Sequence, residues 1–250
     1  MMDTVVMAFI LTVCSGLSTL LGFVLVLVPF SSEKKVIASS LAFASGVMIC
    51  VSITDLIPEG IVILEEYLNG LFVCLLSFLF IMIGIFMAYL LSKKVSFYVE
   101  SSSLYKVGII SMIVIILHNV PEGIATFLST TKNVSLGMSL AIAIALHNIP
   151  EGISIGVPIY YSTKSKSKAF FYTFVAALSE PLGALFTFLF LVPIINNLVL
   201  ACLFLFIAGV MIYISLIDLF PASYQEHYKY FTYFFFCFGI SVMLLKFFIL

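Results

Sequence analysis

The chain has 250 residues, of which 63% are hydrophobic and only 9% charged, and its formal net charge is −1. A soluble domain carries roughly 25% charged residues, so this composition excludes a water-soluble globular protein and favours an integral membrane protein. All eleven basic residues are lysines. Without an arginine-rich patch, no nucleic-acid partner is expected.

Apolar stretches long enough to cross a bilayer recur along the whole chain. A membrane-spanning helix needs about 20 apolar residues, and short polar segments separate stretches of this length. The first stretch lacks a basic leader and a small-residue cleavage site, so a retained span is expected rather than a removed signal peptide. The predicted helices cover about residues 5–28, 36–57, 68–91, 107–128, 134–157, 169–193, 198–220 and 229–250. We therefore predict an all-α integral membrane protein with a single domain over residues 1–250.

Lysines are distributed unevenly between the loops. If the eight predicted helices alternate in direction, nine of the eleven lysines share one side, and the other side carries only Lys132 and Lys246. Short cytoplasmic loops are enriched in basic residues, so both termini are expected outside the cytoplasm of a multi-pass cell-membrane protein.

Two internal repeats divide the chain. The pattern Gly-Val-Met-Ile-x-x-Ser-x-x-Asp-Leu-x-Pro occurs at residues 46–58 and again at 209–221, and Leu-His-Asn-x-Pro-Glu-Gly-Ile occurs at 117–124 and 146–153. In both cases the two copies fall on helices that run in opposite directions. Such inverted repeats are typical of secondary transporters. The predicted architecture is therefore a 3+2+3 arrangement, with three helices, a central pair and three further helices.

Ionisable side chains lie near the middle of three predicted helices. A carboxylate at this depth costs several kcal/mol unless it faces the bundle interior and meets a partner. A histidine and a glutamate four residues apart share one helix face, so each copy of the central motif offers two ligands. Imidazole and carboxylate together suit zinc and similar transition metals better than calcium or magnesium. The residues concerned are His118, Glu122, His147, Glu151 and Glu180.

Asparagine and proline accompany these ligands. Asn119 and Asn148 lie within one turn of the same glutamates, and their amide oxygens could complete a second, harder metal site. Pro121 and Pro150 lack an N–H, so each helix is expected to kink beside its ligands. The glycine after each glutamate allows a neighbouring backbone to approach closely.

Other polar residues carry weaker signals. Asp55 and Asp218 are candidate pathway residues at the outer and inner mouths, although solvated helix ends would account for them equally well. His227 is expected to be an ordinary loop residue. The five cysteines are spread singly, so no disulfide framework is expected.

Two other functions would also gather histidine and glutamate within a membrane. A proton-coupled carrier of another solute could use them as a relay, but the duplicated asparagines would then have no role. An intramembrane metallohydrolase is disfavoured because the sequence has no His-Glu-x-x-His motif. A transporter of divalent metal, not an enzyme, is therefore expected, with no cofactor beyond the transported ion.

The motifs resemble those of the ZIP (Zrt/Irt-like) family of metal transporters, particularly its bacterial zinc-uptake branch. The resemblance rests on His-Asn-x-Pro-Glu-Gly at 118–123 and 147–152 and on Glu-Pro-Leu-Gly at 180–183, and the eight-helix layout extends it over the whole chain. One departure is the loop at 92–106, which has no histidine where many relatives are histidine-rich. This departure puts in doubt only a metal-sensing role for the loop.

The resemblance implies a binuclear site, uptake toward the cytoplasm and a homodimer in the lipid bilayer. Up to two zinc ions would bind per protomer, and iron, manganese, cobalt, nickel or cadmium could replace zinc. One ion would be held by His118, Glu122, His147 and Glu151, and the other by Asn119, Glu122, Asn148, Glu151 and Glu180, the two shared glutamates bridging the ions.

Overall fold

A computed structural model describes residues 2–28, 32–98, 102–191, 197–224 and 226–245, and nearly all of these residues are helical. Within these ranges the structure contains no β-strand, so the prediction of an all-α protein is confirmed. The elements are α1 (Met2–Leu27), α2 (Glu33–Val51), η1 (Ser52–Leu56), α3 (Ile57–Glu65), α4 (Gly70–Tyr98), α5 (Ser103–Lys132), α6 (Val134–Thr163), α7 (Lys166–Phe186), η2 (Thr187–Leu191), α8 (Asn197–Tyr213), η3 (Ile214–Leu219), α9 (Phe220–Ser223), η4 (Glu226–Tyr228) and α10 (Lys229–Leu245).

Seven continuous helical runs are long and apolar enough to cross a membrane. The helix Lys229–Leu245 is also apolar but shorter. The end of the last predicted helix, at residues 246–250, lies outside the described residues. The prediction of a multi-spanning membrane protein is therefore confirmed.

The second helical run is longer than predicted. The prediction ended it near residue 57, before a cluster of glutamates, but the run Glu33–Glu65 continues through η1 into α3. The predicted end is wrong because glutamate is a good helix former, so charge alone does not end a helix. Asp55 consequently lies on the π-helical turn η1 inside the run, and not at a helix end.

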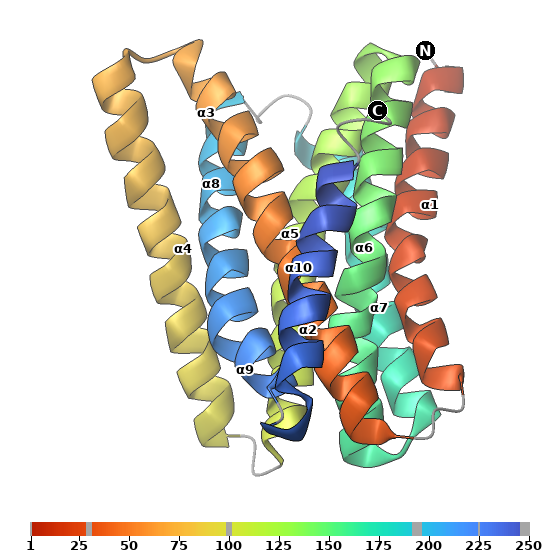
Figure 1. Cartoon of the computed structure of the whole chain (residues 1–250). Helices are drawn as coiled ribbons and strands as arrows, with labels where there is room; N and C mark the ends of the chain where they lie inside the picture. The colour runs from red at the N-terminus through yellow and green to blue at the C-terminus, as the bar shows by residue number, and fades with distance from the viewer. Residues whose placement is uncertain (1, 29–31, 99–101, 192–196, 225, 246–250) are drawn as a thin grey trace.

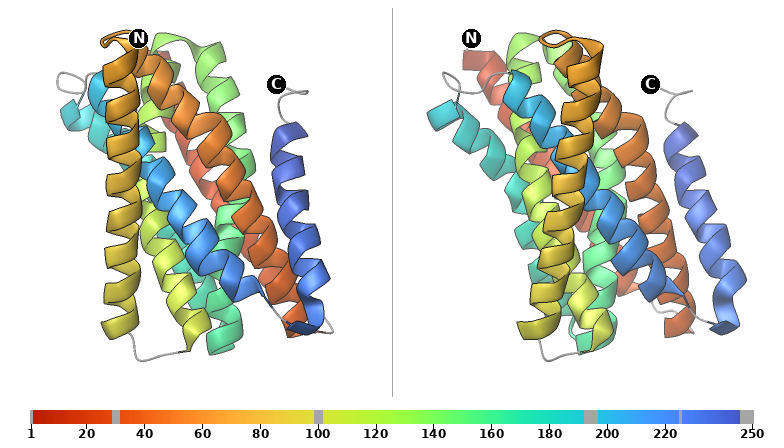
Figure 2. Two further views of the ribbon diagram at one scale, coloured as in Figure 1. Left: turned by 60° about the vertical axis from the view of Figure 1, so that its left-hand side comes forward. Right: turned by 90° about the vertical axis from the view of Figure 1, so that its left-hand side faces the viewer.

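The helices run up and down the bundle, and both described ends of the chain lie at the same end of it (Figure 1). Helices α1, α5, α6 and α7 pack against one another, whereas α10 packs mainly on α2 and α4 mainly on α8. In Figure 2, α10 stands at one edge of the bundle, away from α4.

Glycines bring these two outer pairs into backbone contact. A Cβ atom added at Gly46 on α2 would collide with the Phe236 carbonyl on α10, and one added at Gly209 on α8 would collide with the Ile81 carbonyl on α4. Gly46 and Gly209 are the matching first residues of the outer repeat. The two copies therefore pack in the same manner, each against a different helix.

The helix ends and connections that carry nine of the lysines lie together at the end of the bundle opposite the N-terminus, whereas Lys132 lies at the other end, where α5 ends (Figure 1). Two lysines at this end make contacts with other segments. The exposed Lys164 Nζ lies 2.6 Å from Glu33 Oε2, which joins the α6–α7 connection to the start of α2. Lys106 Nζ donates to the Ser96 carbonyl at 3.0 Å, next to the α4–α5 connection. The helices thus alternate as the lysine distribution requires.

Candidate metal centre

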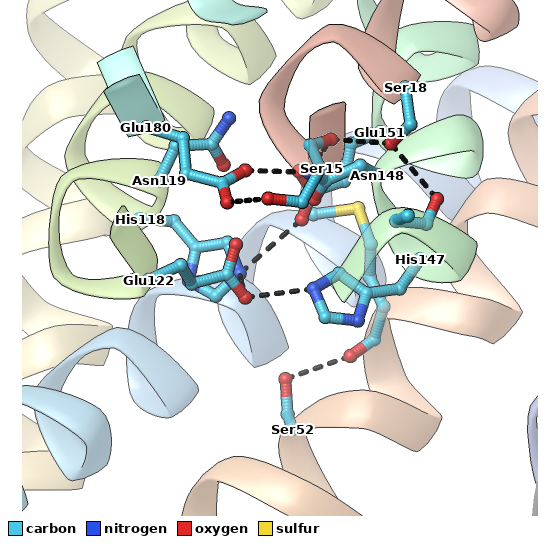
Figure 3. Close-up of polar contacts among 12 residues, drawn as sticks. Ser15, Ser18, Ser52, His118, Asn119, Glu122, His147, Asn148, Glu151 and Glu180 are labelled. Atoms are coloured by element: carbon cyan, nitrogen blue, oxygen red, sulfur yellow. Dashed lines mark hydrogen bonds and ion pairs between the residues drawn. The ribbon is translucent and has the colours of Figure 1, made fainter. Parts of the chain in front are cut away.

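The two copies of the His-Asn-x-Pro-Glu-Gly motif face each other in the bundle interior, one on α5 and one on α6 (Figure 3). Residues four apart lie on one face of a helix, so each copy directs a histidine and a glutamate to the same place. The four side chains are almost fully buried. Their exposed fractions are 1% for His118, 4% for Glu122, 6% for His147 and 0% for Glu151.

The donor atoms of these four side chains converge. Glu122 Oε1 lies 3.1 Å from His118 Nε2 and 2.8 Å from His147 Nε2. Glu151 Oε1 lies 3.4 Å from His118 Nε2. One donor atom from each of His118, His147 and Glu151 lies within 4.8 Å of the others, a spacing at which they could hold a metal ion. Zinc binds imidazole nitrogen and carboxylate oxygen at roughly 2 Å, so such neighbouring donors can share one ion.

Carboxylates dominate the charge of this centre. Glu122, Glu151 and Glu180 are all buried, and within the described residues their only ion-pair partners are the two histidines. Several buried carboxylates without a permanent cation need either protons or a bound cation. A divalent cation supplies this charge and the ligands for it are already gathered.

The amide nitrogens and the amide oxygens of the two asparagines differ in their hydrogen bonding. Asn119 Nδ2 donates to the Ala176 carbonyl on α7 at 3.3 Å, and Asn148 Nδ2 donates to the Ser15 carbonyl on α1 at 2.9 Å. Both Oδ1 atoms are buried, and neither has a hydrogen-bond partner in the part of the chain that the structure describes. A buried, unpartnered carbonyl oxygen is costly unless it meets a ligand. Both oxygens are therefore available to a metal ion.

Glu180 on α7 joins this group through hydrogen bonds. Its Oε2 accepts from Asn148 Nδ2 at 3.0 Å, and its Oε1 accepts from the hydroxyl of Ser15 (Figure 3). The structure thus brings together all seven predicted site residues and adds α1 to the helices that form the site.

Sequence reasoning missed the contribution of Ser15. A signal was present, because small residues recur every three or four positions along one face of this apolar helix and all are buried. They are Thr12, Ser15, Gly16, Thr19 and Gly22. Such a small-residue stripe is typical of a helix that packs closely against others in a membrane.

The glycines of the motif permit the close packing that the sequence predicted. A Cβ atom at Gly123 would collide with the Glu180 carbonyl on α7, and one at Gly152 would collide with the Thr19 carbonyl on α1. Helices α5 and α6 continue through Pro121 and Pro150. The kink at these prolines stays a prediction.

A cavity of about 530 Å³ leads from the α3 end of the bundle to the metal centre. Its lining includes Asp55 and Glu59 from η1 and α3, Lys132 at the end of α5, and Glu122 and His147 of the metal centre. Asp55 therefore lines the same cavity as two of the predicted ligands. Its Oδ1 accepts a hydrogen bond from Thr54 at 3.1 Å.

The other weak candidates lie away from this cavity. Asp218, on η3, does not line it and accepts a hydrogen bond from Ser92 on α4 at 3.1 Å. His227 lies on the short turn η4, where its ring packs edge-to-face on Tyr228. A pathway role for Asp218 stays a prediction.

Comparisons with known proteins connect this centre to a family. Residues 99–246, which include both central motifs and Glu180, match the family model described as ZIP Zinc transporter. Three relatives, each named Zinc transporter ZupT, come from Streptococcus mutans, Oceanobacillus iheyensis and Clostridium perfringens. They are 39%, 38% and 35% identical to this chain, and the matches cover 88%, 89% and 91% of it and 89%, 90% and 90% of the relatives.

Proposed function

The chain belongs to the ZIP zinc transporter family, and on this premise we propose that it moves zinc across the cell membrane through the centre on α5, α6 and α7. One observation carries the proposal. Nε2 of both histidines lies within 3.1 Å of Glu122 Oε1 in the buried interior of a membrane-spanning bundle. Mixed imidazole and carboxylate donors suit zinc. The protein is then a transporter and not an enzyme.

The centre is proposed to bind two ions. His118, Glu122, His147 and Glu151 would hold one ion, and the two asparagines would help to hold the other with the same glutamates and Glu180. The unpartnered Oδ1 atoms of Asn119 and Asn148 support the second position. The same donors would accept iron, manganese, cobalt, nickel or cadmium, because divalent transition metals differ mainly in affinity at such sites.

Transport is proposed to run toward the cytoplasm, with both termini outside. The concentration of lysines at one end supports this orientation through the positive-inside rule. The cavity that reaches His147 and Glu122 would then open outward, and Asp55 would lie along the entry route. Cysteine labelling tests the orientation. A cysteine at Glu65 should react with an impermeant reagent from outside, and one at Lys166 should not.

The single transporter domain is proposed to have 3+2+3 inverted symmetry and to form a homodimer. Two features support the symmetry. Both outer repeats contain a π-helical turn with the aspartate, η1 for Asp55 and η3 for Asp218, and both carry a glycine in backbone contact with another helix. A π-turn inside a helix is rare and is frequent at functional sites.

Reconstituted vesicles test the function directly. The purified full chain is inserted into liposomes that contain a zinc-sensitive dye, and zinc is added outside under set pH and voltage gradients. We expect zinc influx above that of protein-free vesicles, and competition by other divalent transition metals but not by calcium or magnesium. Vesicles that take up no zinc or competing transition metal under any gradient would contradict the proposed function.

A further inference from the structure

Helix α1 contributes no metal-ligating side chain to the proposed centre, yet it reaches the ligands through Ser15. This residue is 1% exposed, and its two polar groups act on two different residues of the centre. The hydroxyl donates to Glu180 Oε1, and the main-chain carbonyl accepts from Asn148 Nδ2 at 2.9 Å. Figure 3 shows Ser15 between Glu180 and Asn148.

These bonds fix the orientation of the Asn148 amide. An amide nitrogen has two hydrogens to donate. One is donated to the Ser15 carbonyl and the other to Glu180 Oε2 at 3.0 Å, so both are used. The opposite orientation would set a carbonyl oxygen against another carbonyl and a carboxylate, which repel it. Asn148 Oδ1 must therefore face away from the Ser15 carbonyl and from Glu180 Oε2, and it is buried without a hydrogen-bond partner among the described residues.

Glu180 is held at both of its oxygens. Oε1 accepts from the Ser15 hydroxyl and Oε2 from Asn148, so its carboxylate bridges α1 and α6. The Ser15 hydroxyl has a single hydrogen and two other acceptors in reach, the carbonyls of Leu11 at 3.0 Å and Thr12 at 3.2 Å. A charged carboxylate is the stronger acceptor. The hydroxyl is therefore directed at Glu180 rather than at its own helix.

Close packing between α1 and α7 makes this contact possible. A Cβ atom at Gly16, the residue after Ser15, would collide with the Ala177 carbonyl and would lie too near Pro181 and Glu180. Without that atom the α1 backbone lies against α7 at the level of Glu180. The serine side chain is short, so its hydroxyl reaches the Glu180 carboxylate because the backbones of α1 and α7 are in close contact at Gly16.

The corresponding asparagine has no such partner. Asn119 Nδ2 donates only to the Ala176 main chain on α7 among the described residues. Its orientation therefore depends on helix packing alone. Asn148 donates to the Ser15 main chain and to Glu180, and the Ser15 hydroxyl acts on its orientation through Glu180.

We propose that Ser15 is a positioning residue for the second ion, because it holds Glu180 and Asn148 in the orientation in which Asn148 Oδ1 and the Glu180 carboxylate can bind zinc. This inference rests on the proposed two-ion site. Residues that orient metal ligands typically change affinity by roughly 10–100-fold when they are removed.

Zinc binding to the full chain in detergent, measured by calorimetry, tests the proposal. Ser15→Ala removes only the hydroxyl group and should lower the affinity for one of the two zinc ions by roughly 10–100-fold. The affinity for the ion at the histidines should stay within about twofold of wild type. Thr12→Val is the matched control. It also deletes a buried hydroxyl from α1, one turn away, but that hydroxyl donates only to the Ala8 carbonyl at 2.7 Å. Both ions should bind to it as to wild type.

A double-mutant cycle separates positioning from a general effect on α1. In a Glu180→Ala background, Ser15→Ala should change zinc affinity by less than about twofold, because residues that act through one another are not additive. Equal losses in both backgrounds, equal losses at both ions, or unchanged binding by Ser15→Ala would overturn the proposal. If Ser15→Ala is not monodisperse, Ser15→Gly also removes the hydroxyl, together with the Cβ, and is judged by the same affinity ratios.

The wild-type measurement separates this inference from the function that underlies it. Wild-type protein that binds no zinc would remove the proposed function and the inference together. Wild-type protein that binds a single zinc would overturn the inference, which requires the second ion, and would leave the proposed zinc transport through the histidine position standing.

Discussion

The two central motifs have nearly the same sequence and different surroundings. On α5, the Glu122 carboxylate contacts both histidines, and Asn119 donates to the main chain of α7. On α6, Glu151 Oε1 lies 3.4 Å from His118 Nε2 alone and neither Glu151 oxygen has a hydrogen-bond partner among the described residues, while Asn148 bonds to α1 and to Glu180. Duplication therefore supplied two equal sets of ligands, and the helices that pack around them made the sets unequal. A motif identifies the ligands, whereas its neighbours determine how each ligand is held.

The largest expected effect is the loss of a motif glutamate, and it should be equal for the two copies of the central motif. We predict that Glu122→Ala and Glu151→Ala each lower zinc uptake by about 100-fold or more, because each carboxylate would bind both ions. Loss of a residue that only orients a metal ligand typically costs about 10–100-fold, so loss of a shared ligand should cost at least as much. The measurement is initial uptake into vesicles at equal protein density. His118→Ala should have a smaller effect, because it removes a ligand from one ion only. Near-normal uptake by both glutamate variants would eliminate the proposed centre.

The asparagines should show the inequality between the copies. We expect Asn119→Ala to lower the affinity for the second zinc ion about 10-fold and Asn148→Ala to lower it about 100-fold. Both variants lose an amide oxygen, but Asn148→Ala also removes the amide donor from the buried Glu180 Oε2, and an unpaired buried acceptor is costly, whereas the Ser15 carbonyl keeps the Ser18 hydroxyl as a donor at 2.6 Å. Calorimetry of the two variants in parallel gives the ratio. A larger loss for Asn119→Ala would contradict the comparison.

The smallest expected effect concerns stability. A Cβ atom at Gly123 or Gly152 would collide with the backbone of α7 or α1, so Gly123→Ala and Gly152→Ala should each lower the stability of the fold by about 1–3 kcal/mol. Gly156→Ala is the control, since a Cβ atom there would meet its nearest neighbours at an ordinary 3.5 Å. The control should be neutral or slightly stabilising, because alanine favours a helix more than glycine does. Thermal unfolding in detergent compares the three variants, and equal melting temperatures for all of them would show that the close contacts do not matter.

Much of the fold follows from simple sequence patterns. Apolar stretches of about 20 residues indicated the spans, because a bilayer accepts only helices whose backbone groups are satisfied internally. Their ends could not be predicted with equal accuracy. The run that ends at Glu65 continues past charged residues, since Glu59 lies beside a cavity and not in a loop.

The ligands could also be predicted, because a histidine and a glutamate four residues apart in an apolar helix are too costly to bury without a partner such as a metal ion. The stripe of small residues on α1 indicates close helix packing, but it does not predict the bond from Ser15 to Glu180. A serine in a membrane helix often bonds to the carbonyl one turn before it, as Ser15 can with Leu11. Only the packing of α1 on α7 shows that this hydroxyl also reaches Glu180.

The glycine contacts of the outer pairs constrain the order of assembly during synthesis. Gly46 on α2 packs on α10, and Gly84 on α4 packs on α8, so the two helices of each pair are separated by the whole central site in the chain. A ribosome that feeds the chain into the membrane from its N-terminus delivers α2 and α4 long before their partners exist. Their glycine faces therefore lack their final partners in the meantime. The metal-binding helices α5 to α7 can pack together first, and the outer pairs close around them when α8 and α10 arrive.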